Sequence, residues 1–137
     1  MFVADLHNDI VQRAIIGEDI SKRTNKGHSD LIRLHESCID LEILIIWVSK
    51  IEAKENFFSK ANKMYDLIEN LAAKHDFLSI PKSLREINEN KSHNKLSIPI
   101  GMEGGEAIEN SIKKLIHFVE RGLIYFGPTW NHSLEWV

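Results

Sequence analysis

Leu41-Glu42-Ile43-Leu44-Ile45-Ile46-Trp47-Val48 is the stretch of sequence that decides the fold. It is nearly continuous in leucine, isoleucine, tryptophan and valine, as expected for a strand whose two faces are both buried in a parallel sheet. Its uninterrupted apolar part, residues 43–48, is six residues long, whereas a membrane-spanning helix needs about 20. The stretch therefore predicts a buried strand and not a membrane segment.

Further strands and helices are predicted on both sides of this strand. Short apolar segments predict three more strands, at residues 2–9, 96–102 and 123–126. Amphipathic spacing predicts helices between them, with Ser29 as a possible N-cap of the first one, at residues 29–36, 56–75, 81–88 and 107–120. In the last of these helices, Ile108, Ile112, Leu115 and Val119 are expected to share one face.

Strands that alternate with helices predict an α/β fold with a parallel sheet and right-handed crossovers. Four strands are too few to close a (β/α)8 barrel, which takes about 250 residues. Two architectures remain open on this pattern, a small open α/β sheet or the first half of a barrel. Either one makes residues 1–137 a single domain, and the second makes it a partial barrel.

The composition excludes several classes of function. Acidic and basic residues are interspersed and the net charge is -3, so neither a nucleic-acid partner nor binding to anionic lipid is expected. The single cysteine, Cys38, leaves no internal disulfide and no cysteine metal cluster, which is compatible with a reducing compartment. The first residues lack the charged and apolar regions of a signal peptide. We therefore expect a cytoplasmic protein.

Three side chains at predicted strand ends suggest a metal site. His7 and Asp9 lie two residues apart at the end of the first strand, and Glu103 ends the third. Parallel strands end at a common edge, where active sites form, and nitrogen and oxygen ligands of this mix suit zinc. Each motif alone also fits a surface pair or a turn. Trp130, near the end of the fourth strand, fits either pocket lining or plain packing.

Four segments in the same order resemble the membrane (renal) dipeptidase family of zinc peptidases. Asp5-Leu6-His7-Asn8-Asp9 is similar to the opening Asp-Gly-His-Asn-Asp of that family, and residues 100–105, Ile-Gly-Met-Glu-Gly-Gly, match its Ile-Gly-Val-Glu-Gly-Gly. Residues 28–34 resemble its Thr-Asp-Leu-Pro-Arg-Leu segment, and residues 121–125 and 129–131 resemble its Leu-Gly-Val-Arg-Tyr and Thr-His-Asn region. The resemblance covers essentially all of the chain.

The resemblance implies about the first half of a TIM-like (β/α)8 barrel that holds two zinc ions. It implies that His7 and Asp9 ligate one ion and that Glu103, as the catalytic residue, bridges both. It also implies a zinc-activated hydroxide that attacks the peptide bond of a small dipeptide substrate. Two later histidines, an arginine and an aspartate of the family lie beyond the stretch matched here. Trp130 stands where the family often has a histidine, so its contact with the substrate carbonyl is open.

Three functions are weighed on these grounds. The first is a metal-dependent dipeptidase, present here as an N-terminal portion that is expected to be inactive alone. The second is a non-catalytic fragment or remnant that binds metal weakly or acts as an interaction module. The third, a different amidohydrolase-like barrel, is disfavoured because such barrels usually open with His-x-His and this chain has His7-Asn8-Asp9. A half-barrel would expose two sheet edges, so self-association is also expected.

Overall fold

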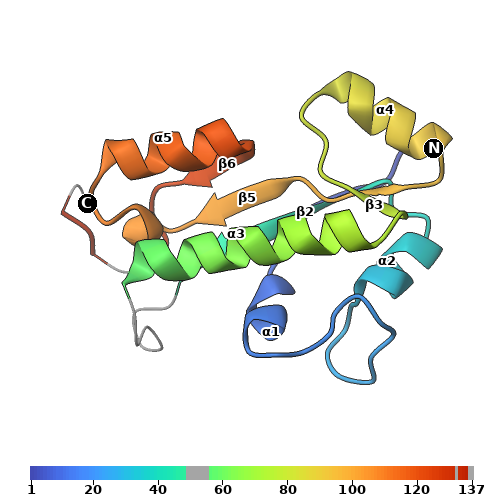
Figure 1. Cartoon of the computed structure of the whole chain (residues 1–137), viewed down its shortest axis with the longest axis horizontal. Helices are drawn as coiled ribbons and strands as arrows, with labels where there is room; N and C mark the ends of the chain where they lie inside the picture. Colours follow the sequence, from blue (N-terminus) through green and yellow to red (C-terminus); the bar gives the residue numbers. More distant parts are fainter. Residues whose placement is uncertain (49–55, 132, 136–137) are drawn as a thin grey trace.

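The computed structural model describes residues 1–48, 56–131 and 133–135. Strands and helices alternate along these ranges (Figure 1) in the order β1 (Ala4–Asn8), α1 (Val11–Ile15), α2 (Leu31–Glu36), β2 (Leu41–Trp47), α3 (Phe57–Lys74), β3 (Leu78–Ser79), α4 (Leu84–Ser92), β4 (Leu96–Ser97), β5 (Ile100–Glu103), the 3-10 turn η1 (Gly105–Ile108), α5 (Ile112–Arg121) and β6 (Leu123–Gly127).

The strands form one sheet in which every pairing is parallel. Strand β2 pairs with β1 on one edge and with β4 and β5 on the other, while β3 pairs with β4 and β6 pairs with β5. The predicted α/β class with a parallel sheet is therefore confirmed. Because all strands run the same way, Trp47, Glu103 and Gly127 lie side by side at the carboxyl ends of β2, β5 and β6.

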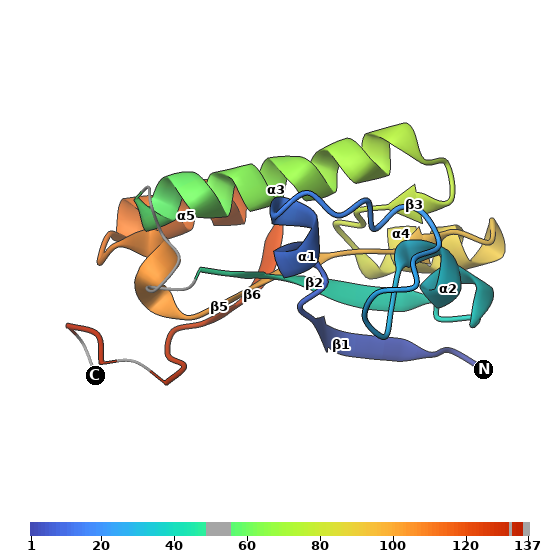
Figure 2. The same ribbon diagram turned by 90° about the horizontal axis from the view of Figure 1, so that it is seen from below.

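Strand β2 separates two apolar clusters, because its side chains alternate between the faces of the sheet. Leu44 and Ile46 belong to the large core under α1 and α3, two helices that lie on the same face of the sheet in Figure 2. Leu41, Ile43 and Ile45 form a smaller cluster on the other face. A residue in the middle of either cluster contributes roughly 1.5–3 kcal/mol by leaving water.

The strand predicted at residues 96–102 is divided in the structure. Strand β4 ends at Ser97 and β5 begins at Ile100, with Pro99 between them. Proline has no N–H to donate to a ladder, although its carbonyl still accepts from the Leu44 amide at 3.0 Å. Strand β3, which pairs with β4, was not predicted because its two residues are too few to show a period.

The helix predicted at residues 107–120 is wrong for residues 107–111. The chain turns through η1, passes positive φ angles at Glu109 and Asn110, and only then enters α5. The Glu109 carboxylate fixes this break by accepting from the Phe58 amide at 3.1 Å and by pairing with Lys114. Of the residues predicted to share one face, Ile112 and Val119 are exposed, Leu115 packs partly buried against the core, and Ile108 is buried in η1. Phe118 is the buried residue of α5.

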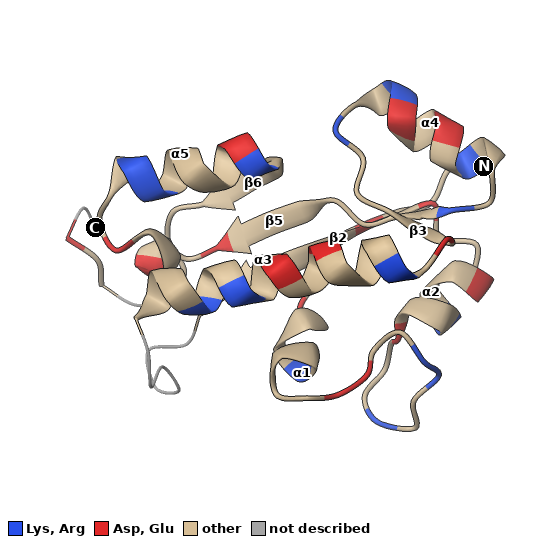
Figure 3. Cartoon of the chain, in the orientation of Figure 1, with Lys and Arg blue, Asp and Glu red and all other residues tan. Residues whose placement is uncertain are grey.

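The N-cap of α2 is Asp30 and not Ser29, since the Asp30 carboxylate accepts from the Arg33 amide at 2.7 Å. Both basic and acidic residues occur along each of α3, α4 and α5 (Figure 3). Among the described residues, no helix is both long and apolar enough to cross a membrane.

Candidate metal centre

His7 and Asp9 lie where β1 passes into α1. His7 is the second-last residue of β1, and the Asp5 carboxylate accepts from its backbone amide at 3.1 Å. Asp9 follows the strand, and its carbonyl accepts from the Gln12 amide at 2.9 Å as α1 begins. Gln12 in turn donates its side-chain amide to the Trp47 carbonyl at the end of β2, at 2.5 Å. These bonds tie the segment that bears both side chains to the central strand.

Glu103 ends β5 between two neighbours of very different size. Trp47 is its register partner on β2 and Gly127 its partner on β6. Gly104 then turns the chain with a φ of +82°, a conformation that favours glycine, and a Cβ there would lie 2.6 Å from Oε2 of Glu106. The positive φ therefore favours glycine directly after Glu103.

The three predicted side chains meet at this edge of the sheet. Nε2 of His7 lies 3.6 Å from Oδ2 of Asp9 and 3.7 Å from Oε2 of Glu103. One ligand atom from each residue lies within 4.8 Å of the others. The side chains of His7 and Asp9 are about half exposed, whereas that of Glu103 is 26% exposed. The cluster is therefore preformed and still open to water on one side.

Tyr125 holds the His7 ring from the other side. Its hydroxyl lies 3.3 Å from Nδ1 of His7 and 3.5 Å from the Leu6 carbonyl oxygen. Burial raises the pKa of Tyr125, and the carboxylates of Glu103 and Asp9 raise it further, so the phenol stays protonated. With Nδ1 next to the phenol, Nε2 is the ring nitrogen that faces the two carboxylates.

Gly101 makes room for that tyrosine. A Cβ at Gly101 would lie 2.7 Å from the Tyr125 ring, whereas one at Gly127 would meet only ordinary contacts of 3.7 Å or more. We expect Gly101→Ala to lower the free energy of unfolding by about 1–3 kcal/mol, since overpacking displaces the ring. Urea denaturation measures this loss, with Gly127→Ala as the matched control. Equal stability of the two variants would contradict the prediction.

A hollow of about 210 Å³ adjoins the cluster. It is lined by Asp9, Gln12, Trp47, Glu103 and Trp130. Trp130 packs edge-on against Trp47, with ring centroids 4.9 Å apart, and remains 47% exposed. The two readings of Trp130 that the sequence leaves open thus coexist in the structure, because the side chain both packs on Trp47 and borders the hollow.

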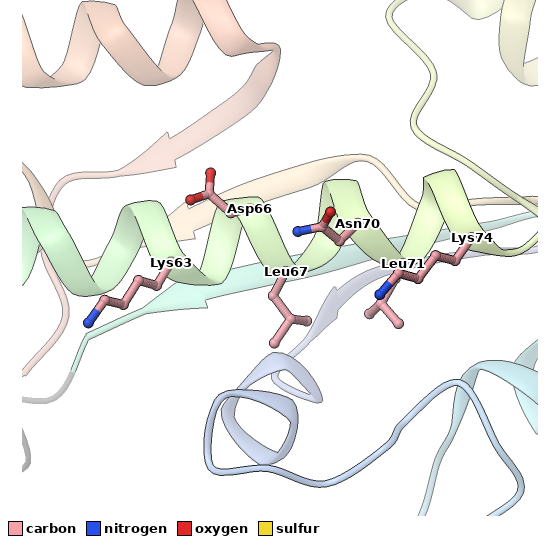
Figure 4. Close-up of a pocket in the computed structure, with 6 residues that line it drawn as sticks. All are labelled: Lys63, Asp66, Leu67, Asn70, Leu71 and Lys74. Carbon is pink, nitrogen blue, oxygen red and sulfur yellow. The ribbon is translucent and has the colours of Figure 1, made fainter.

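A larger hollow on α3 lacks comparable chemistry. Figure 4 shows its lining residues, which all belong to α3: Lys63, Asp66, Leu67, Asn70, Leu71 and Lys74. Its volume is about 390 Å³. Its lining contains one carboxylate and neither histidine nor cysteine, so it offers no ligand set for a metal.

The sequence predicted the imidazole and the two carboxylates of the site. It did not predict Tyr125 and Gln12, the residues that hold the ligand-bearing segment in place. Tyr125 was recognised only as part of a motif, although it lies two residues before Gly127, the register partner of Glu103, and so shares the face of Glu103. Gln12 carries no sequence signal, since its contact is with a backbone carbonyl of another strand.

Comparisons with known proteins point to one family. The family described as membrane dipeptidase (peptidase family M19) matches residues 1–137. Human Dipeptidase 3 is 26% identical over 141 aligned residues, which cover 98% of this chain and 28% of the human protein. Dipeptidase 3 of Macaca fascicularis is 27% identical, with the same shares covered. The chain thus spans about a quarter of the length of these relatives.

Solved structures share the fold. A metallopeptidase from Rhodobacter sphaeroides, liganded with a phosphinate mimic of the dipeptide L-Ala-D-Ala, superposes with a TM-score of 0.84 at 21% identity, covering 97% of this chain and 46% of that one. An amidohydrolase from Pseudomonas aeruginosa gives a TM-score of 0.67 at 16% identity, covering 77% and 31%. The predicted partial TIM-like barrel is confirmed by this likeness.

The match of the family model over the whole chain shows that this chain belongs to the membrane dipeptidase family, peptidase family M19.

Proposed function

We propose that this chain supplies part of the metal centre of a zinc-dependent dipeptidase, with His7, Asp9 and Glu103 as metal ligands. The observation that carries the proposal is the convergence of one imidazole nitrogen and two carboxylate oxygens within 4.8 Å, from strands that are far apart in sequence. Family membership supports the same reading.

The donor set fits a zinc ion in chemistry and in spacing. Zinc takes nitrogen and oxygen ligands at about 2.0–2.2 Å, so two ligands of a tetrahedral site lie roughly 3.4 Å apart. The distances from His7 Nε2 to Asp9 Oδ2 and Glu103 Oε2, 3.6 and 3.7 Å, are close to that separation. Glu103 has a second carboxylate oxygen, which suits the bridging role that the family resemblance implies.

The proposed reaction is hydrolysis of a dipeptide. A divalent ion bound here supplies a Lewis acid that lowers the pKa of water and polarises a peptide carbonyl. The chain's own residues hold and shape the site: Tyr125 orients the His7 ring, and Trp47 and Trp130 give the adjoining hollow an apolar wall. We propose that this wall contacts the substrate. The alternative, a non-catalytic metal-binding or interaction module, keeps the ligands without turnover.

Calorimetric titration of the purified chain with Zn²⁺ tests the metal site. We expect saturable binding that EDTA reverses, and a rise in melting temperature with free zinc, because a ligand that binds only the folded state stabilises it. Heat of binding that is absent, or a melting temperature unaffected by zinc, would refute the proposed site.

Hydrolysis of L-Ala-D-Ala separates the two functions. The 137-residue chain alone is expected to show no turnover even with zinc, because it matches less than half of the Rhodobacter sphaeroides structure. Turnover that a chelator abolishes would show this expectation to be wrong. Turnover by a longer chain that contains these residues, lost on Glu103→Gln, would favour the dipeptidase over the non-catalytic module.

Self-association of the isolated chain is a further expected result. In the described residues β1 pairs only with β2, and β6 only with β5, so each leaves an open edge. Leu6 and Ile124, on these two strands, are 63% and 47% exposed. Open edges with apolar residues favour pairing between chains. Light scattering at increasing concentration measures it, and Leu6→Lys should reduce it. A monodisperse monomer at high concentration would contradict the expectation.

A further inference from the structure

Glu42 is an unusual residue for its position. It lies in the aliphatic run of β2 and its side chain is 0% exposed. One carboxyl oxygen, Oε2, has no hydrogen-bond partner among the described residues. Burying a carboxyl group with an unpaired oxygen costs free energy. Packing alone does not account for this residue, since an aliphatic side chain would fill the same space without that cost.

The other oxygen of Glu42 binds the residue between two of the proposed ligands. Oε1 accepts from the side-chain amide of Asn8 at 2.5 Å. The side-chain oxygen of Asn8, Oδ1, in turn accepts from the Ile10 backbone amide at 3.0 Å. Both ends of the Asn8 amide are thus occupied, and the turn from His7 to Ile10 is held to β2, the neighbouring strand in Figure 2.

The register of β1 against β2 is irregular at the same place. Asp5 pairs with Glu42 and Asn8 pairs with Leu44, so three steps on β1 oppose two steps on β2. One extra residue of this kind is a β-bulge, which redirects side chains and is common beside active sites. His7 lies inside the bulge, and the bond between Glu42 and Asn8 joins the two strands across it.

We propose that Glu42 is a positioning residue of the metal centre, which acts through Asn8 to fix the bulge that presents His7 and Asp9. The proposal rests on the proposed function, because it presumes that these side chains bind a metal. Glu42 itself lies on the helix-covered face of β2, as do Leu44 and Ile46, and it is not among the clustered ligand atoms. Its effect on the metal is therefore indirect.

Zinc affinity of the 137-residue chain, measured by calorimetry, tests the proposal with three variants. Glu42→Leu keeps the volume and removes the acceptor, so Asn8 is released; we expect affinity to fall about 10- to 100-fold, as for other outer-shell partners. Glu42→Gln keeps an oxygen acceptor and should restore affinity to near the wild-type value. Ile68→Val, in the core under α3, controls for general loosening and should bind zinc like the wild type.

The route through Asn8 is tested by a double-mutant cycle. Asn8→Ala should weaken zinc binding as Glu42→Leu does, and the double variant should be no weaker than Asn8→Ala alone, because residues that act through one contact are not additive. Wild-type affinity in Glu42→Leu, or additive losses in the double variant, would overturn the proposal while leaving the proposed function intact. Failure of the wild-type chain to bind zinc would overturn both.

Discussion

Replacement of Glu103 by glutamine is expected to remove most of the zinc affinity of this chain. The substitution keeps the size of the side chain and takes away the charge and the basicity of one ligand out of three. The loss should exceed the roughly 10- to 100-fold that an outer-shell substitution costs, because Glu103 is the less exposed of the two carboxylates that face Nε2 of His7. Calorimetric titration with zinc measures the loss.

The fold should survive this substitution. Without a cation, the carboxylates of Asp9 and Glu103 repel each other across the His7 ring, so Glu103→Gln relieves repulsion in the metal-free chain. We expect unchanged or slightly higher stability without zinc, together with a loss of stabilisation by zinc. Glu89→Gln, on the exposed surface of α4, is the matched control and should bind normally. Equal zinc affinity in the two variants would show that Glu103 is not a metal ligand.

The elements and residues that could be predicted are those whose apolar side chains recur at a regular spacing or whose sequence matches a motif. The run in β2 and the spacing in α3 give side-chain patterns that match one element type only, and the structure has both within a residue of the prediction. The convergence of His7, Asp9 and Glu103 followed from one rule, that parallel strands end at a common edge. Each of these inferences needs only local sequence plus topology.

The unpredicted part depends on contacts between distant residues. The chain breaks before α5 because Glu109 accepts from an amide on α3, a contact 51 residues away in sequence. Tyr125 reaches His7 across 118 residues, and its ring fits there because Gly101 has no side chain. Glu42 interrupts the apolar run of β2 and accepts a hydrogen bond from Asn8 on another strand. Such pairings depend on strand register, which side-chain type alone does not encode.

Glu42 also predicts how stability depends on pH. Burial, with a smaller contribution from Asp5, raises the pKa of Glu42 from 4.5 to about 7, and the hydrogen bond from Asn8 only partly opposes this. Above pH 4.5 the unfolded chain releases this proton while the folded chain retains it. The free energy of unfolding should therefore fall as pH rises from 4.5 to about 7, by roughly 3 kcal/mol from this group, and change no further above that range.

Glu42→Leu should remove this dependence and raise stability at neutral pH. Urea denaturation of both proteins at about pH 5 and about pH 8 measures the difference, in which the titration of the shared histidines cancels. A stability difference that is the same at both pH values would show that Glu42 ionises normally in the fold. The variant that gains stability is the one expected to lose zinc affinity. A gain in the free energy of unfolding together with a loss of zinc affinity would indicate that Glu42 is retained for the metal centre. Replacing a residue that serves only the fold would instead lower the stability of the protein.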